Sequence, residues 1–146
     1  MKRVSINMHI NIEYFREILV KFAENSDVNQ RHSAAIIKGD KILNIGFNKY
    51  CRFAKQNTIH AEMDVLLSLK KKCKHQIKSV DIIIIRISNF NSSTLKNSRP
   101  CNHCIEYLQK YPIRNVYYSN EYGDIVCEKL KNMEKKHVSS GHRMHY

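Results

Sequence analysis

Two short stretches of this chain hold residue types that can bind a metal ion and move protons. In NTIHAEMDVL, Asn57–Leu66, the histidine His60 stands two positions before Glu62. In SRPCNHC, Cys101 and Cys104 are separated by two residues. Imidazole nitrogen and thiolate sulfur are preferred zinc ligands, and three protein ligands leave the fourth tetrahedral position to water. A carboxylate near such a site, such as Glu62, can accept the proton of that water and hand it on.

Either stretch alone has other interpretations. A histidine and a glutamate at this spacing are common by chance, and a lone pair of cysteines can be redox-active or hold a structural zinc ion. A rival hypothesis is a structural zinc module that binds nucleic acid through Cys101, Cys104, His137 and His142. The interval before His137 is much longer than the roughly 12 residues of the common zinc-finger pattern, and this hypothesis gives Glu62 no role.

Both stretches fall where a strand is predicted to end and a helix to begin. The run VDIIIIRI is apolar on both faces and predicts a central strand that is covered on both sides. The polar loop SNFNSSTLKNS follows it, and the apolar spacing after Pro100 predicts a helix that begins near Cys101. A second helix is predicted to start at His60. Because a helix N-terminus carries partial positive charge, it favours the thiolate that a metal needs.

The remaining segments predict a mixed sheet with helices on its faces. Helical spacing of apolar residues predicts a helix over Asn11–Glu24, and SAAII and KILNIGF predict a β-hairpin with Lys38-Gly39-Asp40 as its turn. NVYYS and DIVC predict two further strands joined by a short turn, and hence an antiparallel pair. CEKLKNMEKKH predicts a closing helix. We expect one domain over residues 1–146.

The composition is that of a globular protein with an excess of positive charge. Apolar residues make up 42% and charged residues 26% of the 146 residues, which argues against disorder. The longest apolar run is far shorter than the ~18 residues of a membrane span, so no membrane association is expected. With 25 basic and 13 acidic residues the net charge is +12, which favours a polyanionic partner. Five cysteines without secretory context predict reduced thiols in a cytoplasmic protein, with nuclear entry by diffusion also open.

The two stretches together resemble the signature of a known enzyme family. His60-Ala61-Glu62, followed by Pro100-Cys101-Asn102-His103-Cys104, resembles the H-x-E…P-C-x-x-C pattern of the zinc-dependent cytidine and deoxycytidylate deaminase superfamily. Gly46-Phe47-Asn48 is similar to the family's G-x-N at the end of its second strand. The resemblance implies an α/β protein with the cytidine deaminase-like three-layer α-β-α fold, a mixed five-stranded sheet with helices on both faces.

The resemblance also implies a reaction and the residues that perform it. One catalytic zinc ion would be bound, and no organic cofactor is needed. Water would replace the exocyclic amine of the base, with proton transfer to the ring nitrogen and to the departing ammonia. The residues carried over are His60, Cys101 and Cys104 for zinc, Glu62 for proton transfer, and Asn48, Ala61 and Pro100 for substrate contacts. Members of the family are often dimers or higher assemblies, so a homo-oligomer is also open.

The motifs do not separate the substrates of the family. Met63-Asp64 stands where deoxycytidylate deaminases typically carry Asn-Ala, and Asn102-His103 lacks the methionine common in tRNA adenosine deaminases. SRPC resembles polynucleotide cytosine deaminases, although this chain has no tryptophan. The antiparallel final hairpin favours the free-nucleoside branch, whereas the charge of +12 favours a substrate with phosphate.

From these features we expect conversion of cytosine to uracil on a phosphate-bearing substrate, with single-stranded nucleic acid slightly ahead of free CMP or dCMP. A deaminase of dCMP, CMP or cytidine in pyrimidine salvage is the first alternative. A tRNA-type adenosine deaminase and an inactive nucleic-acid-binding zinc protein are the others.

Overall fold

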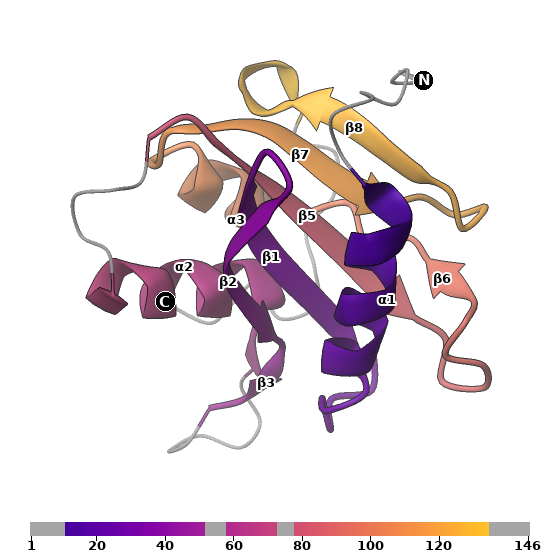
Figure 1. Cartoon of the computed structure of the whole chain (residues 1–146). Helices are drawn as coiled ribbons and strands as arrows, with labels where there is room; N and C mark the ends of the chain where they lie inside the picture. Colours follow the sequence, from indigo (N-terminus) through magenta and orange to yellow (C-terminus); the bar gives the residue numbers. More distant parts are fainter. Residues whose placement is uncertain (1–10, 52–57, 73–77, 135–146) are drawn as a thin grey trace.

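A mixed β-sheet forms the centre of the computed structural model, which describes residues 11–51, 58–72 and 78–134 (Figure 1). Five strands lie in the order β2-β1-β5-β7-β8. Their bounds are His32–Lys38 for β1, Lys41–Phe47 for β2, Val80–Ile87 for β5, Ile113–Ser119 for β7 and Ile125–Lys129 for β8. β5 and β7 are parallel, and the other neighbouring pairs in this order are antiparallel. VDIIIIRI is therefore the central strand, as predicted.

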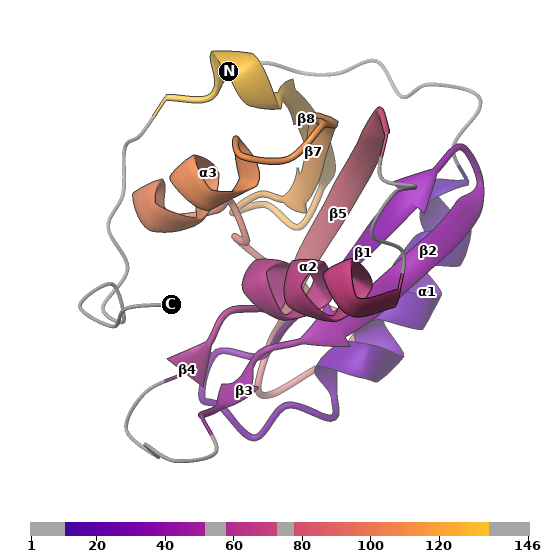
Figure 2. The ribbon, with the colours of Figure 1, turned by 90° about the vertical axis from the view of Figure 1, so that its left-hand side faces the viewer.

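Helices cover both faces of this sheet, which confirms the three-layer fold (Figures 1 and 2). The helix α1 (Ile12–Ala23) lies on one face, and α2 (Ala61–Lys72) and α3 (Asn102–Leu108) lie on the other. α1 begins where the side chain of Asn11 accepts a hydrogen bond from the Tyr14 amide at 3.1 Å, a standard N-cap. It buries Phe15, Leu19 and Ala23, which are four residues apart and so share one face.

The central strand serves both layers because its side chains alternate between the faces. Ile83 and Ile85 pack in the apolar core under α1. Ile82 and Ile84 pack in the core under α2 and α3. A strand buried on both faces needs apolar residues at consecutive positions, and this explains the unbroken run of isoleucines.

Two hairpins were predicted and both are present. β1 and β2 pair antiparallel around a turn in which Gly39 has a φ of +64°, a conformation that suits glycine. β7 and β8 also pair antiparallel, in register from Asn115 opposite Lys129 to Ser119 opposite Ile125. Two small additions were not predicted. β6 (Leu95–Lys96) lies within the expected polar loop and pairs with β5, while β3 (Lys49–Tyr50) and β4 (Thr58–Ile59) form a separate two-stranded sheet.

The predicted closing helix over CEKLKNMEKKH is wrong for its described part. Its first residues continue β8, and a single 3-10 turn, η1 (Leu130–Asn132), follows. Cys127, Leu130 and Met133 are buried at intervals of three, which imitates a helical stripe in the sequence. Cys127 and Glu128 pair with β7 instead, because the sheet supplies hydrogen-bond partners for the backbone there. Residues 135–137 lie outside the described part of the chain.

None of the helices in the described part of the chain combines the length and the apolar character that a membrane crossing would require.

Candidate active site and metal centre

His60 is held at the N-terminus of α2. Its carbonyl oxygen accepts a hydrogen bond from the amide of Asp64 at 2.9 Å, so His60 is the residue that opens the helix, within one position of the predicted start. Glu62 then falls in the first turn and is only 5% exposed. Ala61, between them, is fully buried in the core beneath α2.

The two cysteines are held at the N-terminus of α3. Cys101 is the N-cap, and its carbonyl oxygen accepts a hydrogen bond from the amide of Ile105 at 2.9 Å. Cys104 lies in the first turn of the helix. Both thiols are buried and pack with Met63 of α2, so apolar atoms surround the sulfurs on the side of the protein interior.

The structure brings His60, Cys101 and Cys104 together. Their candidate ligand atoms all lie within 4.8 Å of one another, and the Nδ1 atom of His60 is 3.1 Å from the Sγ atom of Cys104. Ligands of one tetrahedral zinc ion, at about 2.0–2.3 Å from the metal, are separated by distances of this size. The three residues are therefore positioned to bind a metal ion, and two sulfurs with one imidazole nitrogen suit zinc.

The protonation of the cluster also suits a metal site. The hydrogen bond from the thiol of Cys104 lowers the pKa of the Cys101 thiol to about 2, so Cys101 is a thiolate. The same hydrogen bond and burial raise the pKa of Cys104. Burial alone would lower the pKa of His60, but the hydrogen bond with Cys101 and the charge of Glu62 raise it overall. Cys101 thus supplies the thiolate form that a metal ion requires, and metal binding would release the protons of His60 and Cys104.

Glu62 lies beside the cluster in a setting that favours its protonated form. Burial raises the pKa of its carboxyl, and the positive charge of His60 opposes this in part. Within the described residues, the group of ligand atoms within mutual reach contains no carboxylate, and Glu62 instead forms a side-chain hydrogen bond with Cys104, one of the candidate ligands. A carboxyl group whose pKa is raised in this way is a better proton donor than an ordinary carboxyl and can still accept a proton when ionised.

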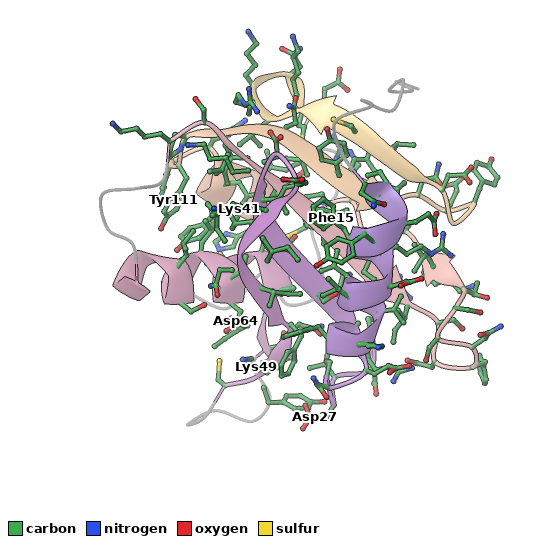
Figure 3. All side chains as sticks on the ribbon, viewed as in Figure 1. Phe15, Asp27, Lys41, Lys49, Asp64 and Tyr111 are labelled. Carbon is green, nitrogen blue, oxygen red and sulfur yellow. The ribbon has the colours of Figure 1, made fainter. Side chains whose placement is uncertain are left out.

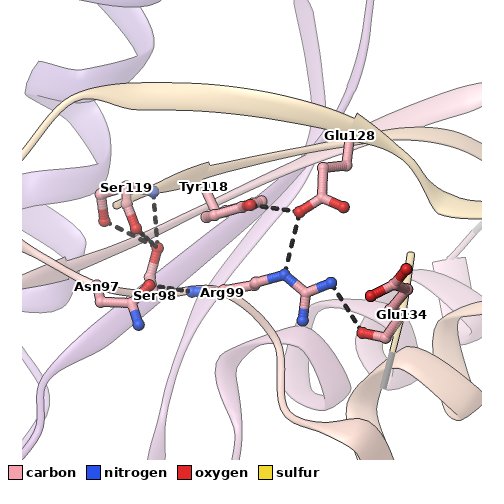
Figure 4. Close-up of polar contacts among 7 residues, drawn as sticks. All are labelled: Asn97, Ser98, Arg99, Tyr118, Ser119, Glu128 and Glu134. Atoms are coloured by element: carbon pink, nitrogen blue, oxygen red, sulfur yellow. Dashed lines mark hydrogen bonds and ion pairs between the residues drawn. The ribbon is translucent and has the colours of Figure 1, made fainter. Parts of the chain in front are cut away.

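A hydrogen-bond network fixes the residues that precede Cys101 (Figure 4). The hydroxyl of Ser98 donates to the carbonyl of Ile84 at 2.8 Å and accepts from the amide of Ser119 at 2.9 Å. Ser98 is thereby tied to both β5 and β7. This network sets the direction in which the chain enters Pro100, which is buried, and then Cys101.

Arg99 extends the same network to the end of the described chain. Its Nε atom is 3.0 Å from Oε2 of Glu128, and its Nη2 atom donates to the carbonyl of Glu134 at 2.8 Å (Figure 4). Tyr118 donates a hydrogen bond to the same carboxylate. β8 and the turn after it therefore support the cysteine loop, a role the sequence did not suggest.

Gly46 lets α2 approach the sheet closely enough to place His60. A Cβ atom at this position would stand 3.3 Å from the backbone nitrogen of Val65 and would collide with the carboxylate of Asp64. Asp64 in turn forms an ion pair with Lys49 at 3.2 Å, and Figure 3 shows the two residues side by side. The glycine of the G-x-N motif thus has a packing role at the first turn of α2.

Asn48 lies at the end of β2, as predicted, and both ends of its side chain bind backbone. Its Oδ1 atom accepts from the amide of His32 at 2.9 Å, and its Nδ2 atom donates to the carbonyl of Gln30 at 2.6 Å. These bonds fasten the start of β1 to the end of β2. The substrate contacts expected at Asn48, Ala61 and Pro100 stay predictions.

Two residues that the motifs did not include lie close to the site. His32 and Arg86 are directly opposite each other in the antiparallel pair of β1 and β5. Ala34 and Ile84, each two positions away, pack in the core under α2 and α3, so alternation places His32 and Arg86 on that same face. The charge of His60 acts on the pKa of His32, so His32 and Arg86 lie near the metal cluster. An arginine within the isoleucine-rich strand was the available signal in the sequence.

Other candidates lie apart from the site or outside the described chain. His103 is not among the clustered ligand atoms, although it stands between the two cysteines. Cys127 is buried in the core under α1, on the opposite face of the sheet. His137 and His142, the partners of the rival zinc module, lie outside the described residues.

Comparison with known proteins agrees with this geometry. The family model described as the cytidine and deoxycytidylate deaminase zinc-binding region matches residues 9–120. A cytidine deaminase from Burkholderia pseudomallei has a similar structure, with a TM-score of 0.64 and 16% identity over 84% of this chain and 94% of that one. A dCMP deaminase from the cyanophage S-TIM5, solved with dCMP and dUMP, has a TM-score of 0.55 and 20% identity over 76% of this chain and 82% of that one.

A curated protein from another functional class also shows similarity. The transcription antitermination protein NusB of Clostridium novyi (strain NT) is 28% identical over 116 residues, which are 77% of this chain and 80% of that protein. This identity is too low to assign a family, whereas the family model spans both motifs of the metal centre. The chain belongs to the cytidine and deoxycytidylate deaminase family, and it is a zinc-dependent hydrolase of that family.

Proposed function

We propose that this protein removes the exocyclic amine of a cytosine base by hydrolysis, releasing ammonia and leaving uracil, and that its substrate is a free nucleoside or nucleotide. The observation that carries the proposal is the buried cluster of His60, Cys101 and Cys104 with the buried carboxyl of Glu62 next to it. His60, Cys101 and Cys104 would hold a zinc ion, which would supply a water nucleophile at neutral pH.

The protein's own residues hold the metal and move the protons. His60 enters the site from the start of α2, and the cysteines enter from the start of α3, so two rigid elements fix the ligand positions. Glu62 would accept one proton from water and donate it to the ring nitrogen, and would then take the second proton of the same oxygen and donate it to the leaving amine, so that ammonia departs and a carbonyl remains. Its raised pKa supports this role, because a carboxyl with an ordinary pKa would hold the proton too weakly at neutral pH.

The end of the sheet supports a free substrate over a polymer. β8 returns antiparallel to β7, an arrangement that favours the free-nucleoside branch of the family. A cytidine deaminase and a dCMP deaminase are both among the similar structures. The net charge of +12 supports a second candidate, deamination of cytosine in single-stranded nucleic acid.

To test this proposal, the zinc-loaded protein is incubated in parallel with each of six substrates: cytidine, CMP, dCMP, adenosine, single-stranded DNA and single-stranded RNA. We expect ammonia and a uracil product from at least one free cytosine substrate, with activity lost on chelation and restored by zinc. Mass spectrometry identifies each product. Uracil formed only in the polymers would favour the second candidate, and the absence of uracil from every cytosine substrate with zinc bound would overturn the proposal.

A further inference from the structure

Arg86 is a cation at the edge of the active site that the deaminase signature does not include. It follows Ile84 on the face of β5 that carries α2 and α3, and it lies opposite His32 in the sheet. The charges of Arg86, His60 and Cys101 all act on the pKa of His32. Arg86 therefore lies on the face of the sheet that carries the metal cluster, and His32 is near both.

The described part of the chain supplies no anion to neutralise Arg86. Its Nε atom is buried and has no hydrogen-bond partner there. The ion pairs of the described residues join Lys49 to Asp64, Arg99 to Glu128 and Arg114 to Asp81, and none involves Arg86. Burial lowers the pKa of Arg86, and no carboxylate opposes this effect.

His32, which lies opposite Arg86 in the sheet, carries no negative charge that could neutralise the guanidinium. The Nδ1 atom of His32 lies 2.9 Å from the carbonyl oxygen of Gln30, which can only accept, so Nδ1 carries the proton. Burial lowers the pKa of the ring to about 4, and His32 is therefore neutral at pH 7. The partly buried guanidinium keeps an unsatisfied Nε donor and a charge that no ion pair of the described residues neutralises.

A cytosine nucleotide carries its negative charge on its phosphate, because the base and the sugar are neutral at pH 7. Arginine is well suited to this group, since its planar donors match phosphate oxygens in a charge-assisted pair. We infer that Arg86 binds the phosphate of the substrate, which makes this protein a deaminase of cytosine nucleotides and not of free nucleosides. The inference rests on the proposed function for the position of the base.

Equilibrium binding tests the inference without requiring turnover. Zinc-loaded Glu62→Gln protein is titrated with dCMP and with deoxycytidine by calorimetry, with and without the substitution Arg86→Met. A hydrogen-bonded ion pair predicts that Arg86→Met weakens dCMP binding by about 10- to 100-fold. It also predicts that the factor by which deoxycytidine binding weakens is at least ten times smaller than the factor for dCMP. Arg86→Lys should recover part of the affinity for dCMP.

A matched substitution separates a local contact from the general positive field. Lys41 is exposed at the start of β2, at the opposite end of β1 and β2 from His32 (Figure 3). Lys41→Met removes the same charge and should leave dCMP binding within about twofold. A cytosine-containing single-stranded oligonucleotide is titrated in parallel. If Arg86→Met weakens the binding of the oligonucleotide together with that of dCMP, the phosphate that Arg86 binds belongs to a polymer.

The outcomes of the inference and of the proposed function are distinct. Equal weakening of dCMP and deoxycytidine by Arg86→Met, or no weakening of dCMP, would overturn the role of Arg86. If the wild-type protein converts none of the cytosine substrates but Arg86→Met selectively weakens dCMP binding, the phosphate contact of Arg86 is supported and the proposed reaction is contradicted.

Discussion

The two faces of the central sheet use the same strands for different purposes. On the α1 face, the core contains Phe15, Leu19 and alternate residues of β1, β5, β7 and β8, and its described members are apolar or weakly polar. On the α2 and α3 face, an apolar core fills the middle, but its edge holds the metal cluster, Glu62, His32 and Arg86. One face stabilises the fold, and the other combines packing with chemistry.

This difference shows how a small domain tolerates buried polar groups. Each titratable group on the chemical face loses solvation, which shifts its pKa and costs stability. The α1 face offsets such costs with close apolar packing. Substitutions on the two faces should therefore have separable effects, and the following tests examine that separation from the largest expected effect to the smallest.

The first test removes proton transfer from the chemical face. Glu62→Gln keeps the shape of the side chain but cannot carry a proton, so kcat should fall by about 10²- to 10⁴-fold. Zinc content and thermal stability should stay close to those of the wild type. The measurement combines steady-state kinetics with metal analysis, and Glu17→Gln on the exposed side of α1 is the control. A Glu62→Gln protein with wild-type kcat would remove the glutamate from the mechanism.

The second test removes packing from the α1 face. Phe15 is fully buried, and Phe15→Ala should lower the free energy of unfolding by about 3–5 kcal/mol, because it removes a large side chain and leaves a cavity. The kcat of the folded fraction should not change. Denaturant titration measures the loss, and Tyr14→Ala, at a neighbouring side chain that is 50% exposed, should cost much less. A kcat that falls further than the folded fraction would show that the two faces are coupled.

The third test measures the cost of a buried histidine on the chemical face. The pKa of His32 is about 4 in the folded protein, below its ordinary value of 6.5, so the unfolded chain binds more protons between these values. The stability tied to neutral His32 is therefore complete above pH 6.5 and is lost as the pH falls toward 4. The ring is not entirely shielded from solvent, and we expect a loss of roughly 1–3 kcal/mol.

His32→Asn isolates this contribution, because an amide can still donate to the carbonyl of Gln30 but does not titrate. Chemical unfolding of both proteins from pH 4 to pH 7.5 should give a shallower acid loss for the variant. Taking the difference between the two proteins removes contributions that they share, including release of zinc. Identical slopes would show that His32 keeps an ordinary pKa.

The fourth test examines the close contact between β2 and α2. Gly46→Ala should destabilise the protein by about 1–3 kcal/mol, because the new methyl group would displace Asp64 and press against the backbone of Val65. In an Asp64→Ala background the cost should shrink, because the carboxylate is gone. A double-mutant cycle in urea measures this coupling. Additive effects of the two substitutions would mean that the helix moves instead of the side chain.

The sequence predicted the parts of the structure that depend on local patterns. Local features made three parts of the fold predictable. The central strand followed from its side-chain pattern, and the hairpin turn followed from Gly39, which suits a left-handed φ. The two helix starts followed from the positions of His60 and Cys101. The clustering of His60, Cys101 and Cys104 followed from the resemblance of their motifs and not from spacing alone.

Features that depend on long-range contacts were missed. The end of β8 was mistaken for a helix because Cys127, Leu130 and Met133 are buried for tertiary reasons at helical intervals. The pairing of Arg86 with His32 depends on the register between two strands that are far apart in the sequence. The contact of Arg99 with Glu128 likewise needs the final hairpin to fold back onto the cysteine loop.

Isotope transfer from water tests the central claim most directly. The zinc-loaded protein is incubated with cytidine, CMP and dCMP in water enriched in heavy oxygen, and the products are weighed by mass spectrometry. The account predicts a uracil product that has gained one heavy oxygen atom in place of the amine, with an equal amount of ammonia, and at least about 100-fold less of both from the Glu62→Gln protein in the same time. Protein that binds zinc but yields no labelled uracil from any of the three would contradict the account.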